Sequence, residues 1–142
     1  MKKILILAGG YSKEKEVSIQ TAKSVYSELN KDKKYKIKVV NPDGKFIQVL
    51  RNFNPNIVLN LLHGRYGEDG YIQAILESEK VKYAHSGVLS SSLAIDKELS
   101  KKIFIKNNIL TPKYLKFSIR NNLNKSKLIN NLQKKIDRKS VV

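Results

Sequence analysis

The chain has 142 residues, which is enough for one domain, or for one domain and the start of another, with a sizeable core. It contains no cysteine, which excludes disulfide bonds and thiolate zinc sites and fits a reducing compartment. A formal net charge of +16 would suit nucleic acid or an anionic membrane, but the lysines are scattered and no aromatic residues alternate with them. We therefore interpret the charge as solvated surface and expect no nucleic-acid partner.

The first apolar run, Ile4 to Ala8, has the continuous character of a strand covered on both faces, and Gly9-Gly10 ends it in a turn. The run is too short for a signal peptide and has no cleavage site after it. No later stretch is long enough to span a bilayer. The sequence therefore predicts a soluble, cytoplasmic protein without a membrane partner.

Strand and helix patterns then alternate along the chain. Short apolar, β-branched runs bounded by turn residues predict strands, and apolar residues at helical spacing predict helices. Strands that alternate with helices predict a doubly wound, parallel α/β sheet of the Rossmann type. In chain order we expect a helix that ends near residue 29, a strand over 36–40, a short helix over 46–50, a strand over 57–62, a helix over 72–80 and a brief strand over 81–83.

The pattern changes near residue 96, where a small, apolar segment over 88–95 gives way to the charged run Asp96-Lys97-Glu98. We therefore divide the chain into an amino-terminal domain, 1–95, and the beginning of another, 96–142. In the second part we expect a helix that Thr111-Pro112 stops, because proline ends helices. A strand over 113–117, an amphipathic helix over 123–136 and the first residues of a strand over 140–142 should follow.

The segment from residue 61 to 77 carries the strongest functional pattern, because a buried strand leads into a loop of glycines and charges and then into a helix. Polar side chains therefore gather at the carboxyl end of a strand, where open α/β sheets bind their ligands. Asp69 is expected to cap the helix that follows. His63 and Glu68 have no such structural task and are candidates to face a substrate, although His63 could simply be hydrogen-bonded at the strand end.

The turn after the first strand carries two acidic residues, Glu14 and Glu16. It lacks the spacing of the G-x-G-x-x-G and P-loop motifs, so its glycines give only weak support for phosphate binding. Carboxylates would repel a phosphate and suit a cation instead, for example the ammonium group of a substrate. The alternative is that Glu14 is a solvated turn residue.

Three stretches, in this order and spacing, resemble the D-alanine–D-alanine ligase family. The resemblance runs from Lys3 to about the end of the chain. The second stretch is highly specific and the first nearly so. They are Gly9-Gly10-Tyr11-Ser12-Lys13-Glu14-Lys15-Glu16-Val17-Ser18, then Leu62-His63-Gly64-Arg65-Tyr66-Gly67-Glu68-Asp69-Gly70 with Ile72-Gln73 and Leu76-Glu77, and Ser86-Gly87-Val88-Leu89 through Asp96-Lys97.

The resemblance implies a three-domain enzyme of the ATP-grasp superfamily that joins two D-alanines for peptidoglycan through a D-alanyl phosphate, with ATP and magnesium. Residues 1–95 would be its substrate-binding, pre-ATP-grasp domain, and 96–142 the incomplete start of its ATP-grasp central domain. The family's phosphate loop and metal ligands would lie beyond Val142. The chain alone is therefore expected to be inactive, and the full enzyme is expected to be a homodimer.

The resemblance also implies roles for single residues. Glu14 matches the acid that holds the ammonium of the first D-alanine, and His63 matches a histidine close to the same substrate, so these two are the candidate catalytic residues. Together with Glu68 they form the predicted substrate-binding set. Lys97 matches a lysine that reaches the nucleotide phosphates, although a surface helix lysine would look the same. No metal ligand is expected in this chain.

The sequence departs from the family pattern at two places. Ala74 stands where the family usually has glycine, and Ala84-His85 where it usually has Thr-Gly. Two further interpretations remain open. The chain could be a truncated, non-catalytic α/β binding module, or it could belong to a ligase of the D-alanine–D-lactate type, because the second substrate is selected by residues outside this chain.

Overall fold

The computed structural model describes residues 1–114, 116 and 129–130. The chain divides into two compact units, one ending at Asp96 and the other beginning at Lys97, and each is described by itself. Among the helices of the described part of the chain, none is long and apolar enough to cross a membrane.

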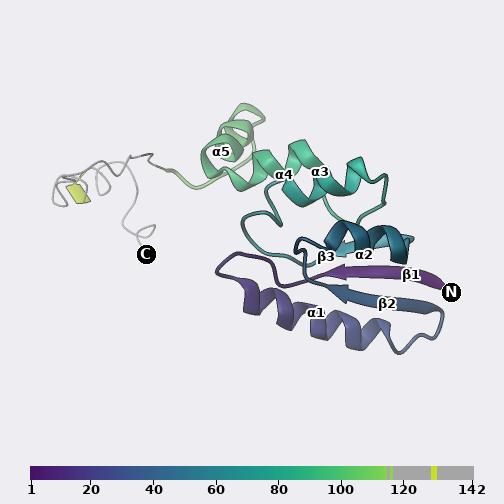
Figure 1. The fold of residues 1–142 in the computed structure, drawn as a ribbon. Coiled ribbons are helices and arrows are strands. Elements are labelled where there is room, and N and C mark those ends of the chain that lie inside the picture. Colours follow the sequence, from purple (N-terminus) through teal and green to yellow (C-terminus); the bar gives the residue numbers. More distant parts are fainter. Residues whose placement is uncertain (115, 117–128, 131–142) are drawn as a thin grey trace. The chain divides into compact units, whose positions relative to one another are not determined.

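The first unit is built on a parallel sheet of three strands, β1 (Lys2–Leu7), β2 (Tyr35–Val40) and β3 (Ile57–Asn60), in the order β2-β1-β3 (Figure 1). The central strand β1 pairs with β2 along its whole length and with β3 from Ile4 onward. After β1 the chain adds β2 at one edge of the sheet, and it then crosses over to add β3 on the other edge of β1. This order creates a switch point at the carboxyl end of β1, between the loops that follow β1 and β3.

Helices cover both faces of this sheet, as Figure 1 shows. Helix α1 (Lys15–Leu29) lies on one face, and α2 (Phe46–Phe53) and α3 (Tyr71–Ser78) lie on the other. Helix α4 (Val88–Ile95) completes the first unit and contacts α3. The predicted doubly wound, parallel α/β sheet is therefore confirmed for this unit.

The side chains of β1 explain why a continuous apolar run forms the central strand. Leu5 and Leu7 point into a core shared with α2, α3 and β3, whereas Ile4 and Ile6 point into a core shared with α1. All four are at most 6% exposed. Burying one such side chain contributes about 1.5–3 kcal/mol. Both cores therefore include side chains of β1. Their packing fixes the position of β1, and the acidic turn with Glu14 follows its carboxyl end.

Several boundaries differ from the sequence prediction. The segment 81–83 forms a single parallel bridge between Tyr83 and Val58 and no strand, because the chain bends at Ala84 and His85 and leaves the sheet edge. The predicted strand over 57–62 ends as β3 at Asn60. Helix α2 continues to Phe53, where Asn54 takes a left-handed conformation with φ 46° and ends it.

The second unit begins with helix α5 (Lys97–Lys106), which ends before the predicted stop at Thr111-Pro112. Lys113, Tyr114 and Lys116 are not in a strand, so the predicted strand over 113–117 is wrong at these positions, while its other two residues lie outside the described residues. Ile129 and Asn130 are helical, as expected. The remainder of the predicted helix over 123–136 and the strand over 140–142 also lie outside the described residues.

Candidate functional site

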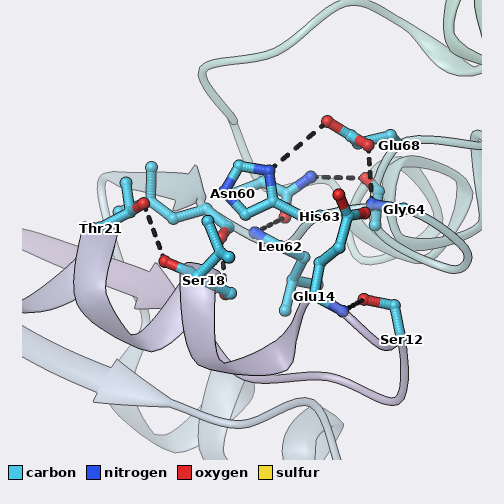
Figure 2. A network of polar contacts seen from close by, with 12 residues as sticks. Ser12, Glu14, Ser18, Thr21, Asn60, Leu62, His63, Gly64 and Glu68 are labelled. Atoms are coloured by element: carbon cyan, nitrogen blue, oxygen red, sulfur yellow. Dashed lines mark hydrogen bonds and ion pairs between the residues drawn. The ribbon is translucent and has the colours of Figure 1, made fainter. Parts of the chain in front are cut away.

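Two loops meet at the switch point of the sheet. One follows β1 and leads into α1, and the other follows β3 and leads into α3. Figure 2 shows side chains from both loops, with Glu14 on the first and His63 and Glu68 on the second, gathered around the backbone of Gly64. The structure therefore brings together the three residues that the sequence predicted as substrate-binding.

Glu14 immediately precedes α1 and does not cap it with its side chain. Its backbone N–H donates to the hydroxyl of Ser12 at 3.1 Å, which leaves the carboxylate to extend toward the second loop. A methyl group added to Gly64 would lie only 2.9 Å from Oε2 of Glu14. The carboxylate is exposed and thus available to a cation at the junction of the two loops.

His63 and Glu68 face each other within the second loop. The distance from Nδ1 of His63 to Oε1 of Glu68 is 3.8 Å, an ion pair when the imidazole is protonated. The other oxygen of Glu68 accepts from the N–H of Gly64 at 2.7 Å, which fixes the carboxylate beside the ring. Nε2 of His63 is buried and has no hydrogen-bond partner among the described residues. The alternative interpretation of His63, a ring satisfied at a strand end, therefore does not describe this nitrogen.

Buried amides hold the second loop in shape. Nδ2 of Asn60 and Nε2 of Gln73 both donate to the carbonyl of Gly67, at 2.8 and 3.0 Å, and Oδ1 of Asn60 accepts from the N–H of Leu62 at 3.2 Å. The sequence analysis assigned no role to either residue. Their signal was a polar residue inside an otherwise apolar strand for Asn60, and a polar residue on the buried face of a helix for Gln73.

Asp69 contacts the start of α3, as predicted, but it is not the N-cap residue of that helix. Its carboxylate accepts from the N–H of Tyr71, the first residue of α3, at 3.1 Å, and also from the N–H of Tyr66 at 2.8 Å. The N-cap position itself is occupied by Gly70 in a left-handed conformation with φ 93°. Asp69 therefore ties the loop to the start of the helix and satisfies the first N–H of α3.

A cavity of about 340 Å³ opens beside the second loop at the carboxyl ends of the strands. His63 lines it, whereas Glu14 and Glu68 do not. The lining combines aromatic rings with a guanidinium group, and Arg65 stacks over the ring of Tyr66 at 5.0 Å. Its residues are Gly10, Tyr11, Pro42, Leu62, His63, Arg65, Tyr66, Gly67, Tyr71 and Ile72.

Lys97 is the first residue of α5 and is exposed. It belongs to the second unit, so its predicted contact with a nucleotide stays a prediction. His85, which replaces a small residue of the family pattern, is exposed at the bend that follows Tyr83. No group of three or more histidine, aspartate or glutamate residues in the described part of the chain could hold a metal ion.

A parallel α/β unit with polar loops at its switch point is typical of domains that bind small ligands. Comparison with known proteins makes this more specific. The chain is 57% identical over 129 residues to the D-alanine–D-alanine ligase of Pelagibacter ubique, a match that covers 90% of this chain and 42% of that protein. It is 42% identical over 122 residues to the enzyme of the same name from Carboxydothermus hydrogenoformans, covering 86% of this chain and 39% of the relative.

Comparison of the fold with solved structures also finds D-alanine–D-alanine ligases. The structure is similar to that of a D-alanine–D-alanine ligase from Bacillus anthracis complexed with ATP, with a TM-score of 0.74 and 36% identity over 92% of this chain and 44% of the other. No protein-family model matches the chain. The resemblance to D-alanine–D-alanine ligases predicted from the motifs is confirmed, for a chain that spans about two fifths of the length of these curated relatives.

Proposed function

We propose that this chain is the amino-terminal portion of an ATP-dependent D-alanine–D-alanine ligase that makes the D-alanyl-D-alanine dipeptide for peptidoglycan. Residues 1–95 would be its substrate-binding domain, and 96–142 the start of its ATP-grasp central domain. The single observation that carries the proposal is the meeting of Glu14 with His63 and Glu68 around Gly64. These are the motif residues, and the relatives to which the chain is 57% and 42% identical are D-alanine–D-alanine ligases.

Glu14 would bind the ammonium group of the first D-alanine. Its exposed carboxylate forms no ion pair with a cation of the described residues, so a substrate ammonium would be its first charged partner. A charge-assisted hydrogen bond between an ammonium and a carboxylate is roughly twice as strong as a neutral one. Glu14 would therefore orient the amino acid so that its carboxyl group points away from the acidic turn.

His63 would contact the same substrate from the other loop, since its ring lies at the junction and its buried Nε2 has no partner among the described residues. Glu68 would hold the ring, because its carboxylate is itself fixed by the N–H of Gly64. The two loops would thus contact the same substrate, with Glu14 on one loop and His63 on the other.

ATP, when bound, supplies the phosphoryl group that activates the carboxylate of the first D-alanine. We assign Lys97 to the nucleotide phosphates, because it is the lysine of the third motif and its ammonium is exposed. Magnesium would accompany the nucleotide, and the described residues hold no group of three or more carboxylate or imidazole side chains that could bind it. We propose that its ligands, and the other groups that ligation needs, lie in the part of the relatives that this chain does not match.

The same family inference extends to the whole protein. We propose that it is a homodimer in the cytoplasm, where D-alanine and ATP are available. The chain alone would bind D-alanine weakly and would not catalyse ligation, because phosphoryl transfer depends on several cations and donors positioned around the phosphates.

Binding of D-alanine to the isolated chain tests the proposal. Chemical-shift changes in NMR spectra measure this binding. We expect weak, saturable binding that shifts the signals of Glu14, His63 and Gly64. Replacing Glu14 with Gln should weaken it by at least about tenfold, because a charge-assisted hydrogen bond is lost. Glu16→Gln is the matched control, because it removes the same charge two residues away, in the first turn of α1, and should leave binding unchanged. Equal effects of the two substitutions would refute the role of Glu14.

A further inference from the structure

Ser18 is a fully buried polar residue at the end of the first turn of α1, with 0% of its surface exposed. Its hydroxyl makes two hydrogen bonds, each to a backbone group of another segment. Oγ accepts from the N–H of Gly9 at 2.9 Å and donates to the carbonyl of Leu61 at 2.6 Å. One hydroxyl therefore connects the turn after β1 with the residue that follows β3.

These two partners belong to the two loops of the candidate site. Gly9 has φ +93° and starts the turn that leads to Glu14. Leu61 lies two residues before His63 and is also tied to the central strand, because its N–H donates to the carbonyl of Leu7 at 3.0 Å. The Ser18 hydroxyl thus bridges the sheet at its switch point, where the two loops diverge.

Ser18 is also linked to Glu14 through the helix backbone. Its N–H donates to the carbonyl of Glu14 at 3.1 Å, one turn earlier in the chain. The same residue therefore holds the start of the helix that carries Glu14 and the end of the strand that leads to His63. The hydroxyl supplies the side-chain hydrogen bond that joins α1 to Leu61, so its removal uncouples the helix from the second loop at this point.

We infer that Ser18 is a positioning residue that sets the place of Glu14 relative to His63 and Gly64. Removing the hydroxyl leaves the N–H of Gly9 and the carbonyl of Leu61 buried without their partner. The two loops then lose the bond that joins them, and the carboxylate of Glu14 no longer stays over Gly64. The consequence for D-alanine rests on the proposed function, whereas the contact between Glu14 and Gly64 does not.

The helix offers a matched control. Ser24 lies in the same helix, is exposed, and its hydroxyl donates to the carbonyl of Gln20 at 3.3 Å, inside the helix itself. Ser24→Ala removes the same group as Ser18→Ala without touching either loop. Ser18→Thr retains the hydroxyl and is the conservative variant that should rescue.

The first readout needs no ligand. In the unmodified 142-residue chain we expect a nuclear Overhauser contact between the side chain of Glu14 and the α protons of Gly64. The contact should be lost in Ser18→Ala and retained in Ser18→Thr and Ser24→Ala. If Ser18→Ala does not fold, Ser18→Cys fills the same space with a weak donor and should also lose the contact. A variant that lacks the hydroxyl and keeps the contact overturns the inference, whatever its stability. A serine with a merely structural role would change the unfolding free energy and leave the contact between Glu14 and Gly64 intact.

The second readout is D-alanine affinity by the same NMR titration. It should fall by about tenfold in Ser18→Ala, as expected when a buried hydrogen bond is lost, and stay unchanged in Ser24→Ala. If the unmodified chain binds no D-alanine, the proposed function fails while the contact between Glu14 and Gly64 still decides the role of Ser18. If the chain binds D-alanine and Ser18→Ala binds it equally well, the inference about Ser18 fails and the proposed function stands.

Discussion

The carboxylate of Glu14 lies over the backbone of Gly64, so close that a Cβ on Gly64 would come within 2.9 Å of Oε2. Gly64 also has φ +68°, a conformation that side chains with a Cβ rarely adopt. The glycine is therefore required for two reasons, its own backbone and the approach of an acidic residue from the other loop. This contact joins two motifs that are far apart in the sequence.

Replacing Gly64 with Ala should harm both stability and binding. The left-handed backbone alone would cost about 1–2 kcal/mol, and the methyl group would push the Glu14 carboxylate aside. We expect a lower urea midpoint together with weaker D-alanine binding. Gly44→Ala is the control, because a methyl group on Gly44 would meet no atom within 4 Å and the change should be tolerated. Unchanged binding in a folded Gly64→Ala chain would contradict the proximity of the two loops.

Asn60 and Gln73 should be energetically coupled, because both donate to the carbonyl of Gly67. Either single alanine substitution leaves that carbonyl with one donor, whereas the double substitution leaves it buried with neither of these side-chain donors. An unsatisfied buried group costs about 1–3 kcal/mol. The loss of unfolding free energy in the double variant should therefore exceed the sum of the single losses, measured by urea denaturation. Strict additivity would show that the two amides act independently.

Tyr83 should make the free energy of unfolding fall as the pH rises into the alkaline range. Its hydroxyl donates to Oε1 of Glu77 at 2.6 Å, and this hydrogen bond, with burial, raises the pKa of Tyr83 from 10.0 to about 12. A raised pKa means that the folded state favours the neutral phenol. The stabilisation is thus fully present below pH 10.0 and is lost as the pH rises toward about 12.

The comparison with Tyr83→Phe isolates this effect from every other group that changes stability at alkaline pH. The unmodified chain should be more stable than the variant below pH 10.0, and the difference should shrink as the pH approaches about 12. Urea midpoints of the two chains across this range are the measurement. Curves that remain parallel would show that the hydrogen bond between Tyr83 and Glu77 contributes no pH dependence.

Local patterns were enough to predict the sheet and the site loops. The apolar run of β1 is buried on both faces, and the change from apolar strand to glycines and charges located the second loop, as the structure shows. The predicted strand over 81–83 failed because pairing depends on where the chain goes next, and the bend at Ala84 removes the segment from β3 after a single bridge. A pattern of a few apolar residues cannot report that bend.

Sequence patterns could not predict the residues that support the site, for a related reason. Ser18 lies 43 residues from Leu61, and only the fold brings its hydroxyl to that carbonyl. The partnership of Asn60 with Gln73 likewise depends on the path of the loop between them. Charged residues such as Glu14 stand out in a turn, whereas buried polar residues that hold backbone groups resemble ordinary helix or strand positions.

The most direct test of the account is a chimera in which this chain replaces the matching amino-terminal part of the Pelagibacter ubique enzyme, to which it is 57% identical. ATP-dependent formation of D-alanyl-D-alanine is measured for the parent, the chimera and the chimera with Glu14→Gln. We predict an active chimera whose activity is largely lost with Glu14→Gln. A folded chimera that binds ATP but forms no dipeptide, beside an active parent, would contradict the claim that this chain is the substrate-binding part of such a ligase.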